Sequence, residues 1–136
     1  MLCTQMKKAK ATISIISLLL SVDASAENIW VKAKEGNWEL SRETLTAMKT
    51  DIEVYTKNEA KAQGRELLDW NRYMFQYLAR EVDGQKNILV NALCVKESPR
   101  ELVDYLLTAG GGNCYFSLKY DPEKNGYYGL FVNGST

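Results

Sequence analysis

The chain has 136 residues, with 17 basic and 17 acidic side chains and no histidine. A neutral chain without a basic cluster lacks the charge pattern of a nucleic-acid-binding protein. The absence of histidine excludes Ser-His-Asp and Cys-His catalysis and every zinc or iron site that needs an imidazole ligand. The composition therefore predicts a protein that is not an enzyme, uses no cofactor or metal, and does not bind nucleic acid.

The first 26 residues are typical of a bacterial secretory signal peptide. Lysines 7, 8 and 10 give it a basic start, residues 11–22 carry no charge, and small side chains end the segment at Ala26. The uncharged run is shorter than the roughly 20 residues needed to span a bilayer, so we expect no membrane anchor. We predict cleavage after Ala26, a periplasmic or secreted location, and a single mature domain of residues 27–136.

The first elements of that domain are an extended arm and a helix. Residues 27–40 predict an arm or short strand around Gly36. From Ser41, a potential N-cap, apolar side chains recur at helical spacing, at Leu45, Met48, Ile52 and Tyr55. Gly64 stands where a helix would end. We predict a helix from Arg42 to Gln63.

Residues 65–82 fit two structures. Leu67, Trp70 and Met74 have helical spacing, whereas Tyr73, Phe75 and Tyr77 alternate as in a strand. The pair Asp83-Gly84 that follows is preferred in tight hairpin turns. We favour a hairpin of residues 71–82 with residues 86–95, and a helix over residues 65–81 stays open as the alternative.

Another helix and hairpin are predicted beyond residue 97. Ser98, Pro99 and Glu101 match a helix start, and an apolar stripe continues to about Thr108. Residues 114–120 and 127–133 alternate as strands around a polar turn. The expected fold is α+β with two layers, in which an antiparallel sheet of about four strands carries two helices on one face. Cystatin-like and nuclear-transport-factor-like folds share this order of elements.

Two cysteines remain after removal of the leader, which carries Cys3 away. An even pair in an exported chain predicts a Cys94–Cys114 disulfide, with two buried free thiols as the alternative. The stretch GGGNCYF, residues 110–116, includes the second cysteine. Its glycines follow a predicted helix instead of preceding one, so a phosphate-binding loop is excluded. We interpret GGGNCYF as a joint that lets the disulfide form.

Acidic side chains provide the remaining candidates for chemistry. Asp69 and a cluster on the predicted second helix, Glu97, Glu101 and Asp104, could serve a carboxylate-dependent hydrolase. The turn at residues 121–126 partly matches a calcium loop, but Val132 occupies the place of the bidentate glutamate. We therefore assign no catalytic or metal-binding residue.

Aromatic side chains favour a binding role. They are concentrated on the predicted strands, and alternation prevents all of them from facing one core. Tyrosine and tryptophan suit protein interfaces, although cross-strand packing is the simpler alternative. The candidate interface residues are Trp70, Tyr73, Phe75, Tyr77, Tyr115, Tyr127 and Tyr128.

The motifs together resemble small uncharacterised exported proteins of Gram-negative bacteria. The shared pattern includes Trp70, Tyr73, residues 75–77 (FQY), Cys94 and, beyond them, GGGNCYF, YDP and the closing VNG. The resemblance implies export and a disulfide, and it transfers no site. We expect a periplasmic binding, inhibitory or immunity-like protein whose partner is an envelope or exported protein. A small carboxylate-dependent hydrolase and an accessory component of an envelope or secretion assembly are the alternatives.

Overall fold

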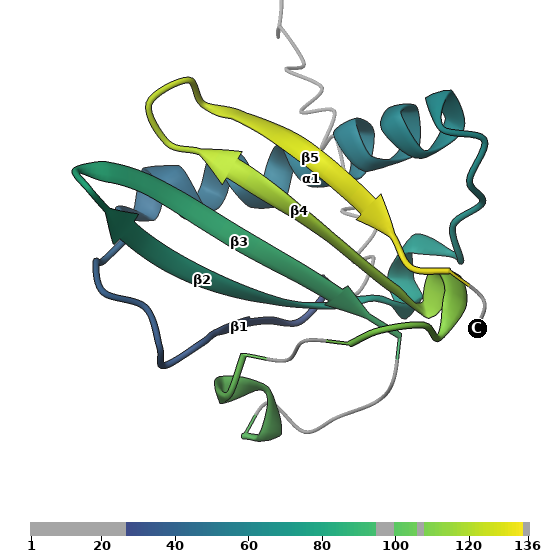
Figure 1. Cartoon of the computed structure of the whole chain (residues 1–136), viewed down its shortest axis with the longest axis horizontal. Coiled ribbons are helices and arrows are strands. Elements are labelled where there is room, and N and C mark those ends of the chain that lie inside the picture. Colours follow the sequence, from purple (N-terminus) through teal and green to yellow (C-terminus); the bar gives the residue numbers. More distant parts are fainter. Residues whose placement is uncertain (1–26, 95–99, 106–107, 135–136) are drawn as a thin grey trace, which may run out of the picture.

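The computed structural model describes residues 27–94, 100–105 and 108–134. Within these ranges the chain forms a five-stranded sheet in the order β1-β2-β3-β4-β5, with one α-helix across one face (Figure 1). β1 is parallel to β2, and the other neighbouring strands are antiparallel. The elements, with η for a 3-10 turn, are β1 Trp30–Lys32, α1 Arg42–Ala62, η1 Trp70–Arg72, β2 Met74–Val82, β3 Gln85–Leu93, η2 Glu101–Val103, η3 Gly112–Cys114, β4 Tyr115–Asp121 and β5 Gly126–Val132.

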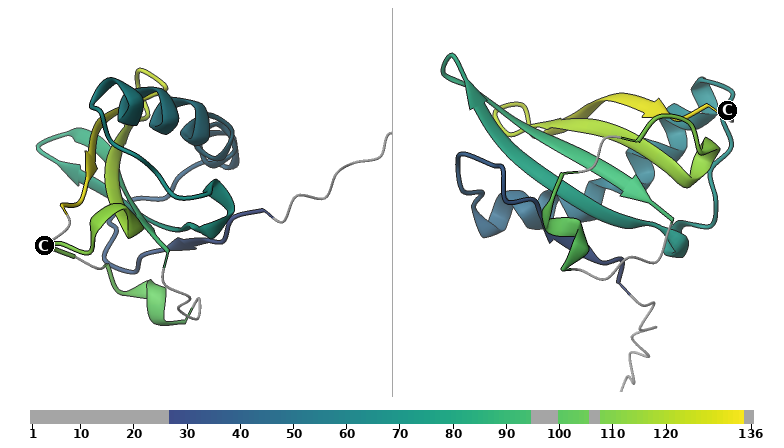
Figure 2. Two further views of the ribbon diagram at one scale, coloured as in Figure 1. Left: turned by 90° about the vertical axis from the view of Figure 1, so that its right-hand side faces the viewer. Right: turned by 60° about the horizontal axis from the view of Figure 1, so that its bottom comes forward.

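The helix α1 begins at Arg42, as the sequence predicted, and ends at Ala62, one residue before the predicted end. Ser41 Oγ accepts a hydrogen bond from the backbone N–H of Thr44 at 3.1 Å, which satisfies one of the free amides of the first turn. Its buried positions recur every four residues, at Met48, Ile52, Thr56 and Ala60. This stripe packs on the sheet, and the views in Figure 2 show the helix and the sheet as two layers.

The hairpin prediction is also confirmed, and the helical alternative for residues 65–81 is not formed. Asp83 and Gly84 both have positive φ, of 52° and 74°, as a type I′ turn requires. The turn sets a register that pairs Phe75 with Ala92 and Tyr77 with Val90. Both pairs point at α1, so the strand buries the aromatic side chains that a helix would have divided between faces.

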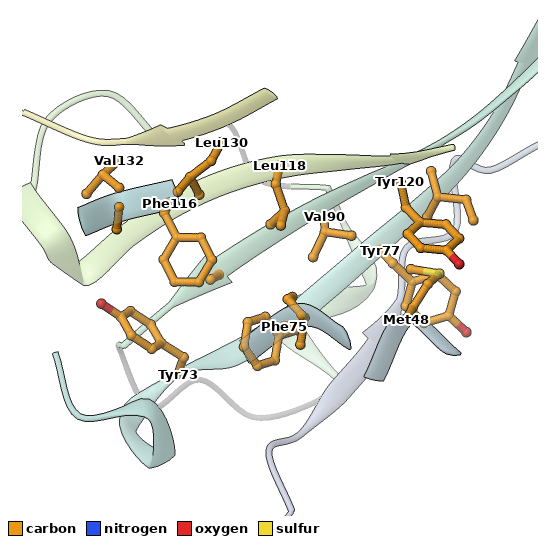
Figure 3. Packing of buried hydrophobic residues seen from close by; sticks show 14 residues of the cluster. Met48, Tyr73, Phe75, Tyr77, Val90, Phe116, Leu118, Tyr120, Leu130 and Val132 are labelled. Atoms are coloured by element: carbon orange, nitrogen blue, oxygen red, sulfur yellow. The ribbon is translucent and has the colours of Figure 1, made fainter. Parts of the chain in front are cut away.

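The core lies between α1 and the sheet. Figure 3 shows Phe116 of β4, Phe75 of β2 and Tyr73, which precedes β2, pointing into the core, with Met48 near Tyr77 and Tyr120 at the other end of the cluster. The ring centroids of Tyr73 and Phe116 are 4.8 Å apart in an edge-to-face arrangement, which adds to the benefit of burial. Tyr77 and Tyr120 are the other buried aromatic residues of the cluster, and its remaining buried members are aliphatic or methionine. Further aromatic side chains pack against it from the margin, at Trp30, Trp38, Tyr55, Trp70 and Tyr127.

A bulge at Gly129 shapes the edge strand β5. The register between β4 and β5 shifts between Ser117 and Lys119, and Gly129 has a left-handed φ of +67°. Beyond the bulge, Leu130 points at the core, and its carbonyl oxygen accepts a hydrogen bond at 3.2 Å from the side chain of Gln63, the C-cap of α1. The helix thereby covers part of an edge that could otherwise pair with another strand.

Two parts of the expected architecture were wrong. The short strand expected as one alternative for residues 27–40 is formed as β1, but it joins the sheet as a fifth strand and runs parallel to β2, so the sheet is mixed and not purely antiparallel. The second α-helix is not formed in the described residues; only the 3-10 turn η2 is present, and Asp104 is extended with ψ 128°. The expected cap at Ser98 and Pro99 lies outside the described residues.

The second helix fails because its backbone acceptors are bound by β2 and by the N-terminal arm. The carbonyl oxygen of Val103 accepts a hydrogen bond from the backbone N–H of Lys34 at 2.8 Å. The carbonyl oxygens of Leu102 and Asp104 accept from the Gln76 side chain at 2.7 and 2.9 Å. An α-helix would use these same carbonyls for its own hydrogen bonds.

The GGGNCYF stretch is the joint that the sequence predicted. Gly110, Gly111 and Gly112 all have positive φ, and the chain then enters η3 and β4. Cys114 is disulfide-bonded to Cys94, and the backbone N–H of Cys94 donates to the carbonyl oxygen of Cys114 at 2.9 Å. The disulfide and this hydrogen bond thus tie the end of β3 to the start of β4.

Candidate functional site

The sheet has a second face, directed away from α1, which we call the outer face. One side of it, over β2, is covered by the segment 100–105. Leu102 of this segment is fully buried against Met74 and Leu93, with Tyr115 packed beside them. The segment is tied to the N-terminal arm by an ion pair of 2.5 Å between Lys34 Nζ and Asp104 Oδ1, which raises the pKa of Lys34.

A row of polar side chains holds this segment on the sheet. Gln76 is fully buried, and its Oε1 accepts a hydrogen bond from Asn91 Nδ2 at 3.1 Å. The Tyr105 hydroxyl donates to Asn91 Oδ1 at 3.4 Å, and burial raises the pKa of this tyrosine. Because a buried amide without partners would cost about 1–3 kcal/mol, these contacts fix the position of the segment.

The other side of the outer face, over β4 and β5, is open. We call its accessible part the outer-face patch, which consists of the exposed Lys119, Tyr128 and Phe131 and the half-buried Asn87 and Ser117. Phe131 lies opposite Ser117 and is 62% exposed, and Tyr128 lies opposite Lys119 and is 40% exposed. Two large aromatic side chains on neighbouring rows of one exposed face are typical of a contact surface.

Two polar contacts order the patch. The Tyr128 hydroxyl donates to Asn87 Oδ1 at 2.5 Å, so the ring is fixed across the strand between them. Lys119 Nζ lies 6.0 Å from the centroid of the Tyr128 ring. No carboxylate of the described residues forms an ion pair with Lys119. The patch therefore offers a cation and two apolar rings to a partner.

Shallow hollows border the patch on two sides. One, of about 290 Å³, lies between Phe131, Ser117 and the Tyr105 side of the covering segment. Another, of about 250 Å³, lies between Tyr128, Asn87 and the β4–β5 turn. Such hollows can receive side chains of a partner, as anchor pockets of protein interfaces do.

The predicted interface aromatics are divided between the core and the surface. Tyr73, Phe75 and Tyr77 are at most 9% exposed, so they are not accessible to a partner in this fold. Trp70 packs against the same core. The Tyr127 hydroxyl donates to the carbonyl oxygen of Met48 at 2.7 Å, and burial raises the pKa of Tyr127.

Two of the seven candidates remain on the outer face. Tyr115 is half-buried beside Leu102, and Tyr128 lies in the patch. Phe131 was absent from the predicted set, although it is the most exposed aromatic side chain of the patch. The signal that could have found it is Gly129, because an isolated glycine within a strand pattern indicates a bulge.

Two of the acidic candidates have structural partners. Asp104 pairs with Lys34, and Asp121 Oδ1 accepts hydrogen bonds from the backbone N–H groups of Glu123 and Lys124 at 2.9 and 3.2 Å. Asp121 thus caps the β4–β5 turn. Glu97 lies outside the described residues. Among those that are described, no group of three or more potential metal-ligating side chains is present.

No helix in the described part of the chain combines the length and the apolar character that a membrane span requires. Comparison of the chain with protein families, with curated proteins and with solved structures finds no match. The assignment of a function therefore depends on the geometry of the molecule alone.

Proposed function

We propose that this protein is an exported binding module that holds and blocks an envelope or exported protein through the outer-face patch. The observation that carries the proposal is the exposure of Phe131 and Tyr128 on one face beside Lys119, which has no ion-pair partner among the described residues. A few aromatic anchor residues commonly supply most of the affinity in protein interfaces.

The chemistry of the patch indicates what the partner must present. Apolar surface should meet Phe131 and Tyr128, and a carboxylate should meet Lys119. The disulfide supports an oxidising compartment, because structural disulfides persist in the periplasm and outside the cell. For export, we expect periplasmic protein to have the mass of a chain beginning at Glu27; full-length chain in the membrane fraction would contradict the proposed location.

The binding surface is tested by a matched pair of substitutions. Phe131→Asp places a charge in the patch, whereas Val54→Asp places one on α1, across the sheet from the patch. Val54 is 66% exposed and Phe131 is 62% exposed, so the two positions are about equally accessible to solvent. Each variant and the wild type are used to capture partners from periplasmic extract, and the affinity for the captured protein is then measured.

We expect one stoichiometric partner, with an affinity that falls at least tenfold for Phe131→Asp and less than twofold for Val54→Asp. A hot-spot aromatic residue is worth about 2 kcal/mol or more, which corresponds to such a change. The activity of the partner should fall on binding. Equal capture by all three forms, or the absence of a stoichiometric partner under several growth conditions, would overturn the proposal.

A further inference from the structure

A further recess, separate from the two hollows beside the outer-face patch, lies elsewhere on the molecule. It has a volume of about 440 Å³ and is formed where the start of β1 and the turn η1 meet the middle of α1. Sites for small molecules usually have volumes of about 300–1,000 Å³. Six side chains define its chemistry, namely Asn28, Trp30, Lys49, Glu53, Trp70 and Asn71.

Two indole rings form the apolar part of this recess. The Trp30 ring is stacked on Phe75 with centroids 4.7 Å apart, so the core covers one of its faces. Trp70 contacts the core through the same Phe75, with ring centroids 5.4 Å apart, and through Tyr73, with ring centroids 5.8 Å apart. Both rings are half-buried and line the recess, and each is held in place by the core rather than by a ligand.

The polar part mixes donors and acceptors. Asn28 Nδ2 donates to the carbonyl oxygens of Trp70 and Tyr73 at 2.8 and 2.9 Å, which leaves its Oδ1 to accept. Lys49 and the Asn71 amide can donate. Glu53 can accept, and it is also paired with Lys57 Nζ at 2.7 Å. The recess therefore offers both kinds of hydrogen-bonding group around two aromatic rings.

The lining of the recess carries charges of both signs. An anion would meet the carboxylates of Glu27 and Glu53, and a cation would meet the ammonium group of Lys49 beside them. Because Glu53 is also paired with Lys57, the recess holds no concentration of one charge that would favour a simple ion. A neutral sugar ring fits, because its C–H faces stack on indole rings while each hydroxyl group both donates and accepts a hydrogen bond.

We propose that this recess is a binding subsite for a neutral sugar unit of a glycan. Trp30 and Trp70 contact the faces of the ring, and Asn28, Lys49 and Asn71 bind its hydroxyl groups. The proposal is independent of the proposed function, since the outer-face patch shares none of these residues. A protein that holds a partner on one surface and a glycan on the other would be retained at a glycan-bearing structure.

The tryptophans provide a direct assay. Two of the three tryptophans in the chain line the recess, and the third, Trp38, has its Nε1 buried and lies 5.1 Å from Lys86 Nζ. Tryptophan fluorescence of the mature protein is titrated with cellotetraose, maltotetraose and the β-1,4-linked tetramer of N-acetylglucosamine. Choline and sulfate serve as probes for a cationic and an anionic ligand. We expect at least one of the glycans to bind with a Kd of about 0.1–1 mM.

Exposed residues of the recess test the site without disturbing the core. Asn71→Ala and Lys49→Ala change exposed side chains, and each should weaken glycan binding at least threefold. Lys61→Ala, an exposed lysine on the last turn of the same helix, should change it less than twofold. Isothermal titration calorimetry on the same variants measures binding through heat and so checks that the fluorescence change reports binding.

Several results would overturn the assignment. One is the absence of any fluorescence or heat signal with all three glycans at about 10 mM, which is tenfold above the weakest expected Kd. Another is tighter binding of choline or sulfate than of the glycans. A third is unchanged glycan binding by the double variant of Lys49 and Asn71.

Discussion

Replacing Cys94 and Cys114 together by serine should lower the free energy of unfolding by about 3 kcal/mol. The two cysteines are separated by 20 positions, and closing a loop of this length restricts the unfolded chain by about that amount in the chain-entropy model. Two contacts at the joint do not depend on the sulfur atoms. They are the 2.9 Å hydrogen bond between the backbones of the two cysteines and the 2.6 Å bond from the Tyr73 hydroxyl to the carbonyl oxygen of Asn113. The native joint should therefore persist in the variant.

Urea unfolding followed by tryptophan fluorescence measures this loss. For a slope of about 1–3 kcal/mol/M, the midpoint should fall by roughly 1–3 M. Reduced wild-type protein is the control and should resemble the double variant. A loss below about 1 kcal/mol would refute the loop-entropy argument. Rapid alkylation of a native thiol, or loss of partner binding by a fully folded Cys114→Ser variant, would show a reactive cysteine instead of a structural one.

Elements with strong local signals were predictable from the sequence. The helix α1 has a capping serine and an apolar stripe at helical spacing, and both signals act within one segment. The turn at Asp83-Gly84 needs positive φ at two positions, which few residue pairs tolerate, so it fixed the hairpin. The disulfide followed from the number of cysteines and the leader pattern, without any knowledge of distance.

Elements that depend on distant partners were not predictable. The segment after Pro99 has a good helix start, but Gln76 and Lys34 take the carbonyl groups that the helix would use. Gln76 is more than 20 residues away in sequence, so no local pattern could reveal this competition. The parallel pairing of β1 with β2 likewise depends on residues 45 positions apart, such as Trp30 and Phe75.

The outer-face patch was only partly predictable for a geometric reason. Tyr128 and Phe131 are three positions apart, so strict alternation assigns them to opposite faces of β5. The bulge at Gly129 inserts an extra residue, and both side chains then point outward. Tyr128 was therefore found among the aromatic candidates without its neighbour Phe131, and Lys119 was treated only as part of an alternating strand.

Three further changes probe the fold that presents these surfaces. Gly111→Ala should lower the free energy of unfolding by about 2 kcal/mol or more, because Gly111 has a φ of +77° and an added Cβ would lie 2.5 Å from the Tyr115 ring. Urea unfolding measures this loss, and Gly134→Ala, which has open space around it, is the control. Gln76→Leu should lower the free energy of unfolding by about 2–3 kcal/mol, since two carbonyl oxygens of the 100–105 segment lose their donor. The backbone amides of that segment should also lose protection against hydrogen exchange. The last prediction concerns pH. Burial raises the pKa of the Tyr127 phenol well above its ordinary value of 10.0, so above that pH the folded chain keeps a proton that the unfolded chain releases. Stability is then fully present below about pH 10 and falls as the pH rises, and this residue contributes up to about 1.4 kcal/mol per pH unit to the fall. Tyr127→Phe should flatten the loss of stability between about pH 10 and 11.5 by that slope, as measured by urea unfolding at a series of pH values. Equal slopes for the variant and the wild type would mean that Tyr127 ionises as readily in the folded chain as in the unfolded one, which its buried hydrogen bond to α1 should prevent.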